Sequence, residues 1–237
     1  MGTIYRITLR QLLGRWRLLI MTGLAAMPVI MTAVMLGAGN APDVRQFEDV
    51  VFDHMLAGSI TPLVVLAIAT PAFGSEIEDA TLANLTLAPL PRWKIVLPKL
   101  LAPVTFAGVF IGASAFVTGQ MAYLGDLRAT LSVTAGALAG VALYGSAFTW
   151  LGMVSSRAVG VGLAYVVLWE GLFTSFVSGA RLLSIRHHTV SLVHALDPLR
   201  FAGAETLDAG TAGAVSAALF LGFLWLAVRR LRTMDVP

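Results

Sequence analysis

The sequence contains no cysteine and few charged residues. Charged side chains make up 12% of the 237 residues, against about 25% in ordinary soluble domains. Without cysteine the chain has no disulfide, no thiolate metal site and no cysteine nucleophile. The scarcity of charge, with 57% apolar residues and a mean hydropathy of +0.83, excludes a disordered chain and almost any water-soluble enzyme. These values indicate a polytopic membrane protein.

Charge-free apolar runs predict an all-α fold with six transmembrane helices. A helix needs about 20 apolar residues to cross a bilayer, and the sequence lacks the period-2 alternation of a membrane barrel. The predicted spans fall within residues 18–42, 55–75, 100–125, 129–156, 158–180 and 209–228. The first run is longer than the apolar core of a signal peptide, about 7–15 residues, so we expect it to stay in the chain. Residues 1–237 are thus expected to form a single transmembrane domain.

Basic residues are divided unequally between the two sides of these spans. Six spans place both termini on one side, which carries eleven Lys or Arg residues, whereas the other side carries five. The positive-inside rule assigns the more basic side to the cytoplasm. We therefore expect a multi-pass protein in the lipid bilayer of the cell (plasma or inner) membrane, with both termini cytoplasmic. The small net charge of +3 does not indicate a nucleic-acid partner.

Residues 1–17 predict an amphipathic helix before the first span. Its apolar side chains fall at helical spacing and its arginines lie on a neighbouring face: Tyr5, Leu9, Leu12 and Trp16, and Arg6, Arg10 and Arg17. Such an interfacial helix lies in the headgroup plane, with its arginines near lipid phosphates. It either only anchors the first span or also moves with a cytoplasmic partner.

The cytoplasmic loop of residues 75–98 predicts a short amphipathic helix. Its acidic residues favour a helix start, Leu82 and Leu85 share one helical face, and Pro89 ends the helix. Arg92 and the Trp and Lys that follow it mark the return to the membrane surface. A helix of about two turns is not stable alone, so the segment needs a surface on which to dock.

This loop resembles the corresponding loop in permease subunits of type-2 ATP-binding-cassette (ABC) transporters. In that family an acidic stretch after the second span leads to a leucine-rich turn, a proline and an Arg-Trp pair. The matching residues are Glu76, Glu78, Asp79, Thr81, Leu82, Leu85, Pro89, Arg92, Trp93 and Lys99. The residues that depart from the family pattern are Ala80, Ala88, Pro91, Lys94 and Pro98. The N-terminal helix, six spans and long segment before the last span extend the resemblance over the whole chain.

The resemblance implies that residues 80–88 form the coupling helix, which sits in a groove of an ABC ATPase subunit. The residues expected to couple are Glu78, Asp79, Thr81, Leu82, Leu85, Pro89 and Arg92. Because the sequence has no Gly-x-x-x-x-Gly-Lys-Ser/Thr motif, we expect no enzyme and no cofactor here, with ATP and Mg on two copies of the partner ATPase. A second permease, the same chain or a paralogue, would complete an exporter of a hydrophobic or amphipathic substrate.

In this family, spans two and five line the path between the two permeases. The residues that the resemblance places on the translocation path are Thr61, Thr70, Glu170, Thr174 and Phe176. Glu170 is the one acid well inside a predicted span, so it is a functional candidate that binds a cationic group or carries a proton. The alternative is that Glu170 pairs with a polar neighbour or lies nearer the interface.

A long external segment, residues 181–208, precedes the last span. Its amphipathic pattern, divided by Pro198, predicts two short re-entrant helices that dip back toward the membrane and cap the outer end of the path. His187, His188 and His194 are poorly spaced for a metal site, which needs three or four ligands. We interpret them as interfacial or solvated histidines and predict no metal site.

Two pairs of small residues permit close contact between helices. Gly108 and Gly112 are four residues apart, as are Gly136 and Gly140. Such small-xxx-small pairs let two helix backbones approach closely in a membrane. We expect both pairs to serve packing within the chain.

Two other functions remain as alternatives. An ATPase-independent channel or scaffold has no need of the amphipathic cytoplasmic loop. An intramembrane protease needs a nucleophile turn or a His-Glu-x-x-His motif. The nearest match to a nucleophile turn, Gly145 and Ser146, lacks the second glycine. The sequence therefore favours the transport subunit.

Overall fold

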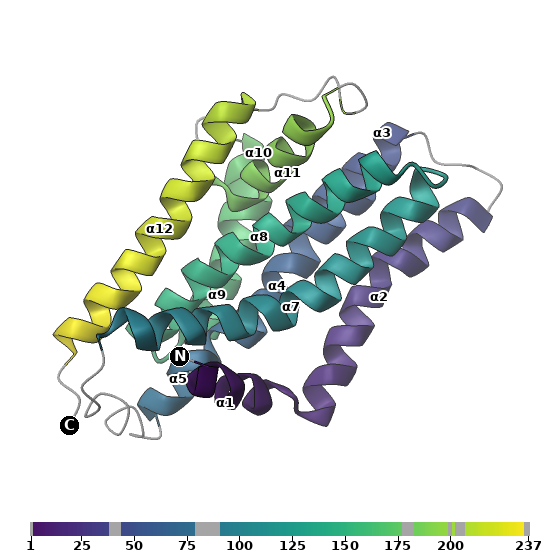
Figure 1. Cartoon of the computed structure of the whole chain (residues 1–237). Coiled ribbons are helices and arrows are strands. Elements are labelled where there is room, and N and C mark those ends of the chain that lie inside the picture. The colour runs from purple at the N-terminus through teal and green to yellow at the C-terminus, as the bar shows by residue number, and fades with distance from the viewer. Residues whose placement is uncertain are drawn as a thin grey trace.

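The computed structural model describes residues 2–37, 44–78, 91–176, 183–198, 201 and 207–234, and these residues form helices and no strand. Five helices are long and apolar enough to cross a membrane: Arg15–Gly37, Arg45–Gly74, Trp93–Ala122, Leu127–Val154 and Ala209–Thr233. Figure 1 shows them as an elongated bundle. The all-α fold is confirmed, and the long apolar helices indicate a membrane-embedded protein.

The fifth predicted span, residues 158–180, corresponds to a shorter apolar helix. It consists of α9 (Ala158–Ala164) and the π-helix η2 (Tyr165–Phe173), continued by α10 (Thr174–Phe176). At 1.5 Å per residue, Ala158–Phe173 extends about 24 Å and the helix with α10 about 28 Å, close to the hydrocarbon core of about 30 Å. The end of the predicted span, residues 177–180, lies outside the described residues. The count of six spans therefore stays a prediction.

The two ends of the bundle carry different elements (Figure 1). The terminal end, as we call it, holds α1 (Gly2–Leu12), α5 (Pro71–Glu78) and the last turns of α12 (Ala209–Thr233). The opposite, distal end holds α3 (Val44–Phe47) and α11 (Ile185–Leu196). The chain thus brings its first and last helices to the same end, as an even number of spans requires.

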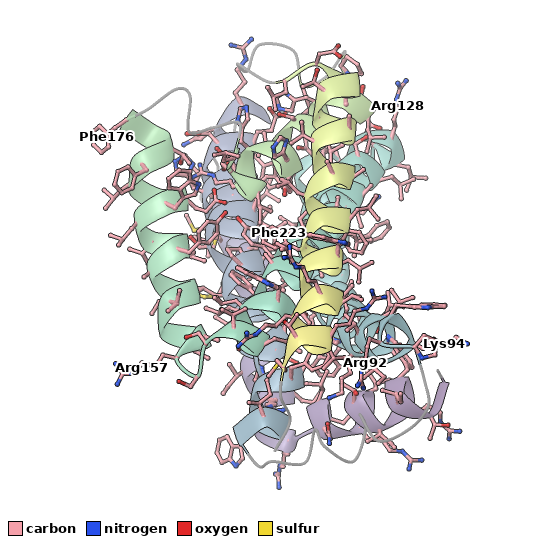
Figure 2. The ribbon with its side chains drawn as sticks, turned by 90° about the vertical axis from the view of Figure 1, so that its left-hand side faces the viewer. Arg92, Lys94, Arg128, Arg157, Phe176 and Phe223 are labelled. Atoms are coloured by element: carbon pink, nitrogen blue, oxygen red, sulfur yellow. The ribbon has the colours of Figure 1, made fainter. Side chains whose placement is uncertain are left out.

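Basic residues follow the same division. Figure 2 shows Arg92, Lys94 and Arg157 toward the terminal end and Arg128 at the distal end. Of the eleven basic residues that the sequence places on one side, Arg6 and Arg10 lie in α1, and Arg229, Arg230 and Arg232 lie in the last turns of α12. The compartment that each end faces stays a prediction.

Helix α8 (Leu127–Val154) is the centre of the bundle. It packs against α4 (Thr61–Ala69), α7 (Trp93–Ala122), α11 and α12. Its glycines allow this: a side chain at Gly136 or Gly140 would collide with Thr189 and Val193 of α11. Close packing within the chain, expected for this pair, is therefore confirmed. A side chain at Gly112 would meet Leu138 of α8 less closely, at 3.2 Å.

The buried core has two parts. The larger part lies among the π-helix η1 (Glu48–Ile60), α4, α7 and α8, where Tyr144 and Phe148 stack at 5.6 Å between ring centroids. The smaller part lies at the terminal end and joins α5, α7, α8 and α12. Its buried residues are Phe73, Ile95, Val96, Met153, Ala227 and Leu231. This second cluster lies where the chain enters and leaves the predicted coupling loop.

Helices α2 (Arg15–Gly37) and α12 lie at the periphery. Within their most apolar stretches, only 22% and 11% of residues are buried, against 72% for Arg45–Gly74. Apolar side chains such as Ile30, Val34 and Leu221 are exposed instead. In water such a surface would cause aggregation, so it fits contact with lipid or with another chain.

The N-terminal helix is shorter than predicted. It ends at Leu12, and α2 begins at Arg15 rather than after residue 17. Gly14 lies in the break between them, where a residue without a side chain bends easily. Trp16 consequently belongs to α2 and is 78% exposed, whereas Tyr5 and Leu12 lie on the face of α1 that packs toward α7.

Candidate functional site

The predicted coupling loop connects α5 to α7 at the terminal end. Helix α5 ends at Glu78, and Arg92 directly precedes α7, where its carbonyl accepts the N–H groups of Ile95 and Val96 at 3.0 Å. The other coupling residues, which lie outside the described residues, are Asp79, Thr81, Leu82, Leu85 and Pro89. The predicted helix of residues 80–88 lies outside them as well, and of Glu78 only the backbone is described. The structure therefore describes the two helices between which the loop lies, α5 before it and α7 after it.

A buried lysine joins the two helices that carry this loop. Lys99 of α7 is 1% exposed, and its Nζ donates to the carbonyl of Ala72 in α5 at 3.1 Å. The same ammonium lies 4.5 Å from the ring centroid of Phe73, within cation–π range. Because a buried charge needs such partners, Lys99 fixes the chain before the loop to the chain after it.

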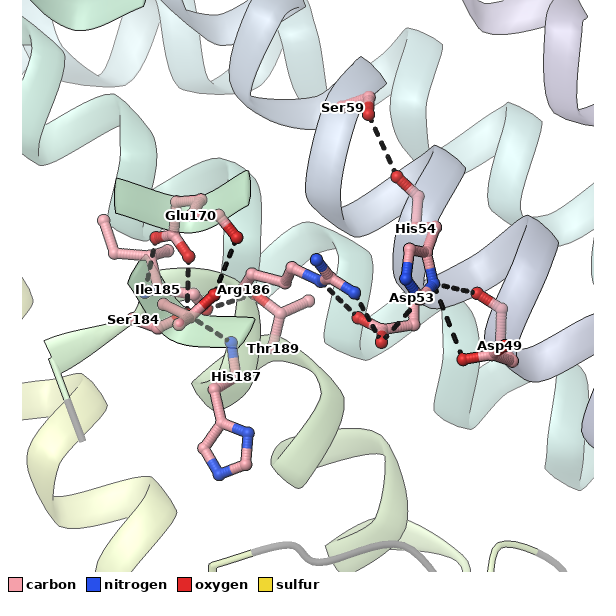
Figure 3. A network of polar contacts seen from close by, with 11 residues as sticks. Asp49, Asp53, His54, Ser59, Glu170, Ser184, Ile185, Arg186, His187 and Thr189 are labelled. Carbon is pink, nitrogen blue, oxygen red and sulfur yellow. Dashed lines mark hydrogen bonds and ion pairs between the residues drawn. The ribbon is translucent and has the colours of Figure 1, made fainter. Parts of the chain in front are cut away.

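Glu170 is the second candidate, and it lies in η2 near the distal end. Its carboxylate is buried, with a residue exposure of 1%. The Tyr165 hydroxyl and the backbone N–H of Ile185 each donate to Oε1 at 2.9 Å, and the Ser184 hydroxyl donates to Oε2. Figure 3 shows Glu170 facing Ser184, the N-cap residue of α11, and Ile185, its first residue. Both carboxylate oxygens therefore accept hydrogen bonds from the protein.

These contacts place a negative charge at the start of α11. The first N–H groups of a helix have no partner within the helix, and they carry partial positive charge. Glu170 accepts one of them, while the Ser184 hydroxyl accepts another from His187 at 3.0 Å. The observed bonds agree with the alternative in which Glu170 pairs with polar neighbours. A role in cation binding or proton transfer stays a prediction.

The next residue of α11 forms a second attachment. Arg186 binds Asp53 of η1 in a two-pronged ion pair, with Nη2 donating to Oδ2 at 2.7 Å and Nε donating to Oδ1. The side chains are 15% and 27% exposed. Burial acts to lower the pKa of Arg186, but the hydrogen bonds and charge of Asp53 outweigh it and raise the pKa. The guanidinium therefore stays charged, and α11 is fixed to both π-helices (Figure 3).

Helix α11 occupies the first half of the segment predicted to hold two short re-entrant helices. Its inward face includes Thr189 and Val193, which fit against the glycines of α8. Beyond its end, the buried Asp197 lies 3.8 Å from Arg128. A helix is thus present before Pro198, as expected, while most of residues 199–206 lie outside the described residues. That α11 is external and re-entrant stays a prediction.

The five predicted path residues do not form one surface in the single chain. Thr61 and Thr70 are buried in the core, and Thr70 donates to the carbonyl of Leu66 at 2.7 Å. Thr174 donates to the backbone carbonyl of Glu170 at 2.7 Å. Phe176 is 83% exposed and points away from the bundle (Figure 2). Of the five, Glu170 and Thr174 are thus joined by a hydrogen bond.

An apolar groove lies beside Glu170. It has a volume of about 340 Å³ and lies among α8, α9, η2, the start of α11 and α12. The residues that line it are Ala147, Phe148, Trp150, Leu151, Val161, Tyr165, Trp169, Leu183, Ile185, Leu219 and Phe223. Tyr165 both lines the groove and donates to Glu170. Sequence reasoning missed this feature because its walls come from separate parts of the chain.

The histidines show no shared metal site. His188 is fully buried, so it is not solvated. His194 stacks on Phe201 with 5.5 Å between ring centroids, and its burial lowers the pKa of its imidazole. Within the described ranges, one group has ligand atoms close enough for a metal ion: Asp49, Asp53 and His54, within 4.8 Å. Asp53 is already bound to Arg186.

Comparisons with known proteins add no further constraint on this geometry. Neither the protein-family models nor the curated proteins contain a match to this chain.

Proposed function

We propose that this chain is the membrane-spanning permease subunit of an ATP-driven ABC transporter. In this proposal two separate ATPase subunits bind ATP and Mg, and a second permease completes the assembly. The main support is the close packing of α5 and α7, the two helices that flank the loop resembling a coupling helix. The two ends of this loop lie at the terminal end, and the Lys99 ammonium and the smaller core cluster join them.

The packing of α5 against α7 suits the transmission of force from the loop to the membrane helices. A docking helix that an ATPase pushes can move the membrane helices only if the connection between them is stiff. Packed interiors transmit displacement rather than absorb it, and coupled helices then move as rigid bodies. Because α7 runs from the loop to the far end of the bundle, a push on the loop would reach the distal end through one continuous helix.

The peripheral helices suit a partner in the membrane. The apolar faces of α2 and α12 are mostly exposed, as is that of α9 and η2, where Val159, Val167 and Phe173 lie. Lipid covers such faces, or a second permease does. The proposal assigns part of this surface to the second subunit, which is either the same chain or a paralogue.

A hydrophobic or amphipathic cargo fits the character of the interior. The groove of about 340 Å³ is lined mainly by aromatic and aliphatic side chains, and its size falls within the range of small-molecule sites, about 300–1,000 Å³. The indole nitrogen of Trp169 is buried and has no hydrogen-bond partner among the described residues. Such a site offers mainly apolar contact. Export is the proposed direction, by the family resemblance.

Purification of the tagged chain from its native membranes tests this proposal. The expected result is an ATPase subunit in stoichiometric amount, lost when Leu82 and Leu85 are both changed to Asp. The matched control is Leu196→Asp, because Leu196 is half-exposed at the distal end. If the folded chain emerges alone and without ATPase activity, the evidence favours an ATPase-independent channel or scaffold.

A further inference from the structure

A second apolar groove lies at the elbow between α1 and α2. It has a volume of about 320 Å³, and α7 forms its remaining wall. Figure 1 shows α1 and α2 meeting at this elbow, with α7 beside both. The lining residues are Tyr5, Leu9, Leu13, Leu18, Thr105, Phe106, Val109 and Phe110. Val109 is 69% exposed and Leu13 is 51% exposed, so the groove is open to its surroundings.

The two helices that meet at this groove carry positive charge. The first 42 residues contain four arginines, Arg6, Arg10, Arg15 and Arg17, and no Asp or Glu. All four side chains are exposed, and none forms an ion pair with another residue in the described part of the chain. The Arg17 guanidinium donates to the carbonyl of Gln11 at 3.3 Å, so it reaches back across the elbow. An apolar groove thus lies next to uncompensated cations.

We propose that this elbow groove binds one anionic phospholipid from the surrounding bilayer. One acyl chain lies along Leu9, Phe106 and Val109, and the phosphate group meets one arginine from each side of the elbow, Arg10 of α1 and Arg17 of α2. Small binding sites combine an apolar concave surface with a few polar groups, and guanidinium groups bind phosphate through two parallel hydrogen bonds. Basic pockets between membrane helices bind anionic headgroups for this reason.

The charge pattern selects the class of lipid. A zwitterionic lipid also has a phosphate, but its ammonium group would lie near four arginines, in a stretch of 42 residues that contains no acid. A lipid with net negative charge avoids that repulsion. The proposed site uses neither the coupling loop nor Glu170, so it does not depend on the proposed transport function.

Native mass spectrometry of the full chain tests the proposal. The purified protein is titrated with phosphatidylglycerol or with phosphatidylcholine carrying the same acyl chains. We expect one phosphatidylglycerol to be retained at concentrations where phosphatidylcholine is not. Changing Arg10 and Arg17 to Gln should weaken that binding about thirtyfold, since each basic residue near the surface contributes about a factor of five. Arg157→Gln is the matched control, because Arg157 is exposed at the same end but far from the elbow (Figure 2).

Two further variants separate the groove from general charge. Val109→Trp and Leu13→Trp should each fill the groove and remove the retained lipid, and both positions are exposed enough to accept a larger side chain. Circular dichroism and a monodisperse elution profile show that each variant is folded. Equal retention of both lipids, an equal loss in Arg157→Gln, or full binding by both folded Trp variants would overturn the proposal. The proposal would also be overturned if the purified chain carried a bound protein in this groove, and if Val109→Trp removed that protein and no lipid.

Discussion

Replacing Glu170 by Leu or by Gln separates its structural role from a chemical one. Glu170→Leu has a similar volume but leaves the donors of Tyr165, Ser184 and Ile185 without their acceptor. A buried donor without a partner costs about 1–3 kcal/mol, or about 0.6 kcal/mol by values found between membrane helices. For three donors the loss of stability is therefore about 2–9 kcal/mol.

Glu170→Gln should lose much less. The amide oxygen can accept from Tyr165 and Ile185, and the amide nitrogen can donate to the Ser184 hydroxyl oxygen. Only the charge is lost, and hydrogen bonds to charged groups are about twice as strong as neutral ones. We therefore expect the loss of stability in Glu170→Gln to be less than half of that in Glu170→Leu.

Thermal unfolding of the purified variants in one detergent measures this ratio, and hydrogen exchange of the α11 amides locates the effect. In Glu170→Leu the first amides of α11 should lose protection, while those of α8 keep it. Equal stability of the two variants, or full protection of α11 in Glu170→Leu, refutes the view that Glu170 holds α11. A Glu170→Gln protein with native stability and no transport would instead support a chemical role.

Three further outcomes follow from charged groups elsewhere in the structure. A double-mutant cycle with Asp53→Asn and Arg186→Gln should give a coupling of about 1.5–3 kcal/mol in thermal unfolding, because the pair is two-pronged and mostly buried. Lys99→Met should leave the chain folded but remove substrate-stimulated ATPase activity in the assembled transporter, whereas Arg157→Met should not. The lowered pKa of His194 means that the unfolded chain takes up the proton first as the pH falls below about 6.5. Stability should therefore fall with acidification in that range, and less steeply in His194→Gln.

Much of the fold was predictable because apolar runs are a local signal. The helices extend beyond the predicted spans where a charge has a distant partner. We expected the second span to begin at residue 55, since several acids precede it, yet the apolar helix begins at Arg45. Asp53 lies within that helix because Arg186, 133 residues away, binds it. Likewise α7 begins before Lys99, which is buried against α5.

The candidate site was predictable only in part. Glu170 was identifiable as the one acid inside a predicted span, but its partners Ser184 and Ile185 were not, because they belong to another helix. Lys99 appeared in the sequence only as one match to a family pattern, and its contact with Ala72 required coordinates. Both grooves combine residues from three or more elements, so no single stretch of sequence indicates them.

The two attachments of α11 share a property of backbone winding. Asp53 lies in η1 and Glu170 lies in η2. Both elements are π-helices, whose hydrogen bonds join residues five positions apart, against four in an α-helix. Tyr165 therefore lies directly over Glu170, five residues on, where an α-helix would set the two about 140° apart. Deleting one residue of η2 between Ala164 and Glu170 would leave the span nearly as long but rotate the carboxylate away from Ser184. The hold on α11 thus depends on the number of residues in the turn as well as on their identity.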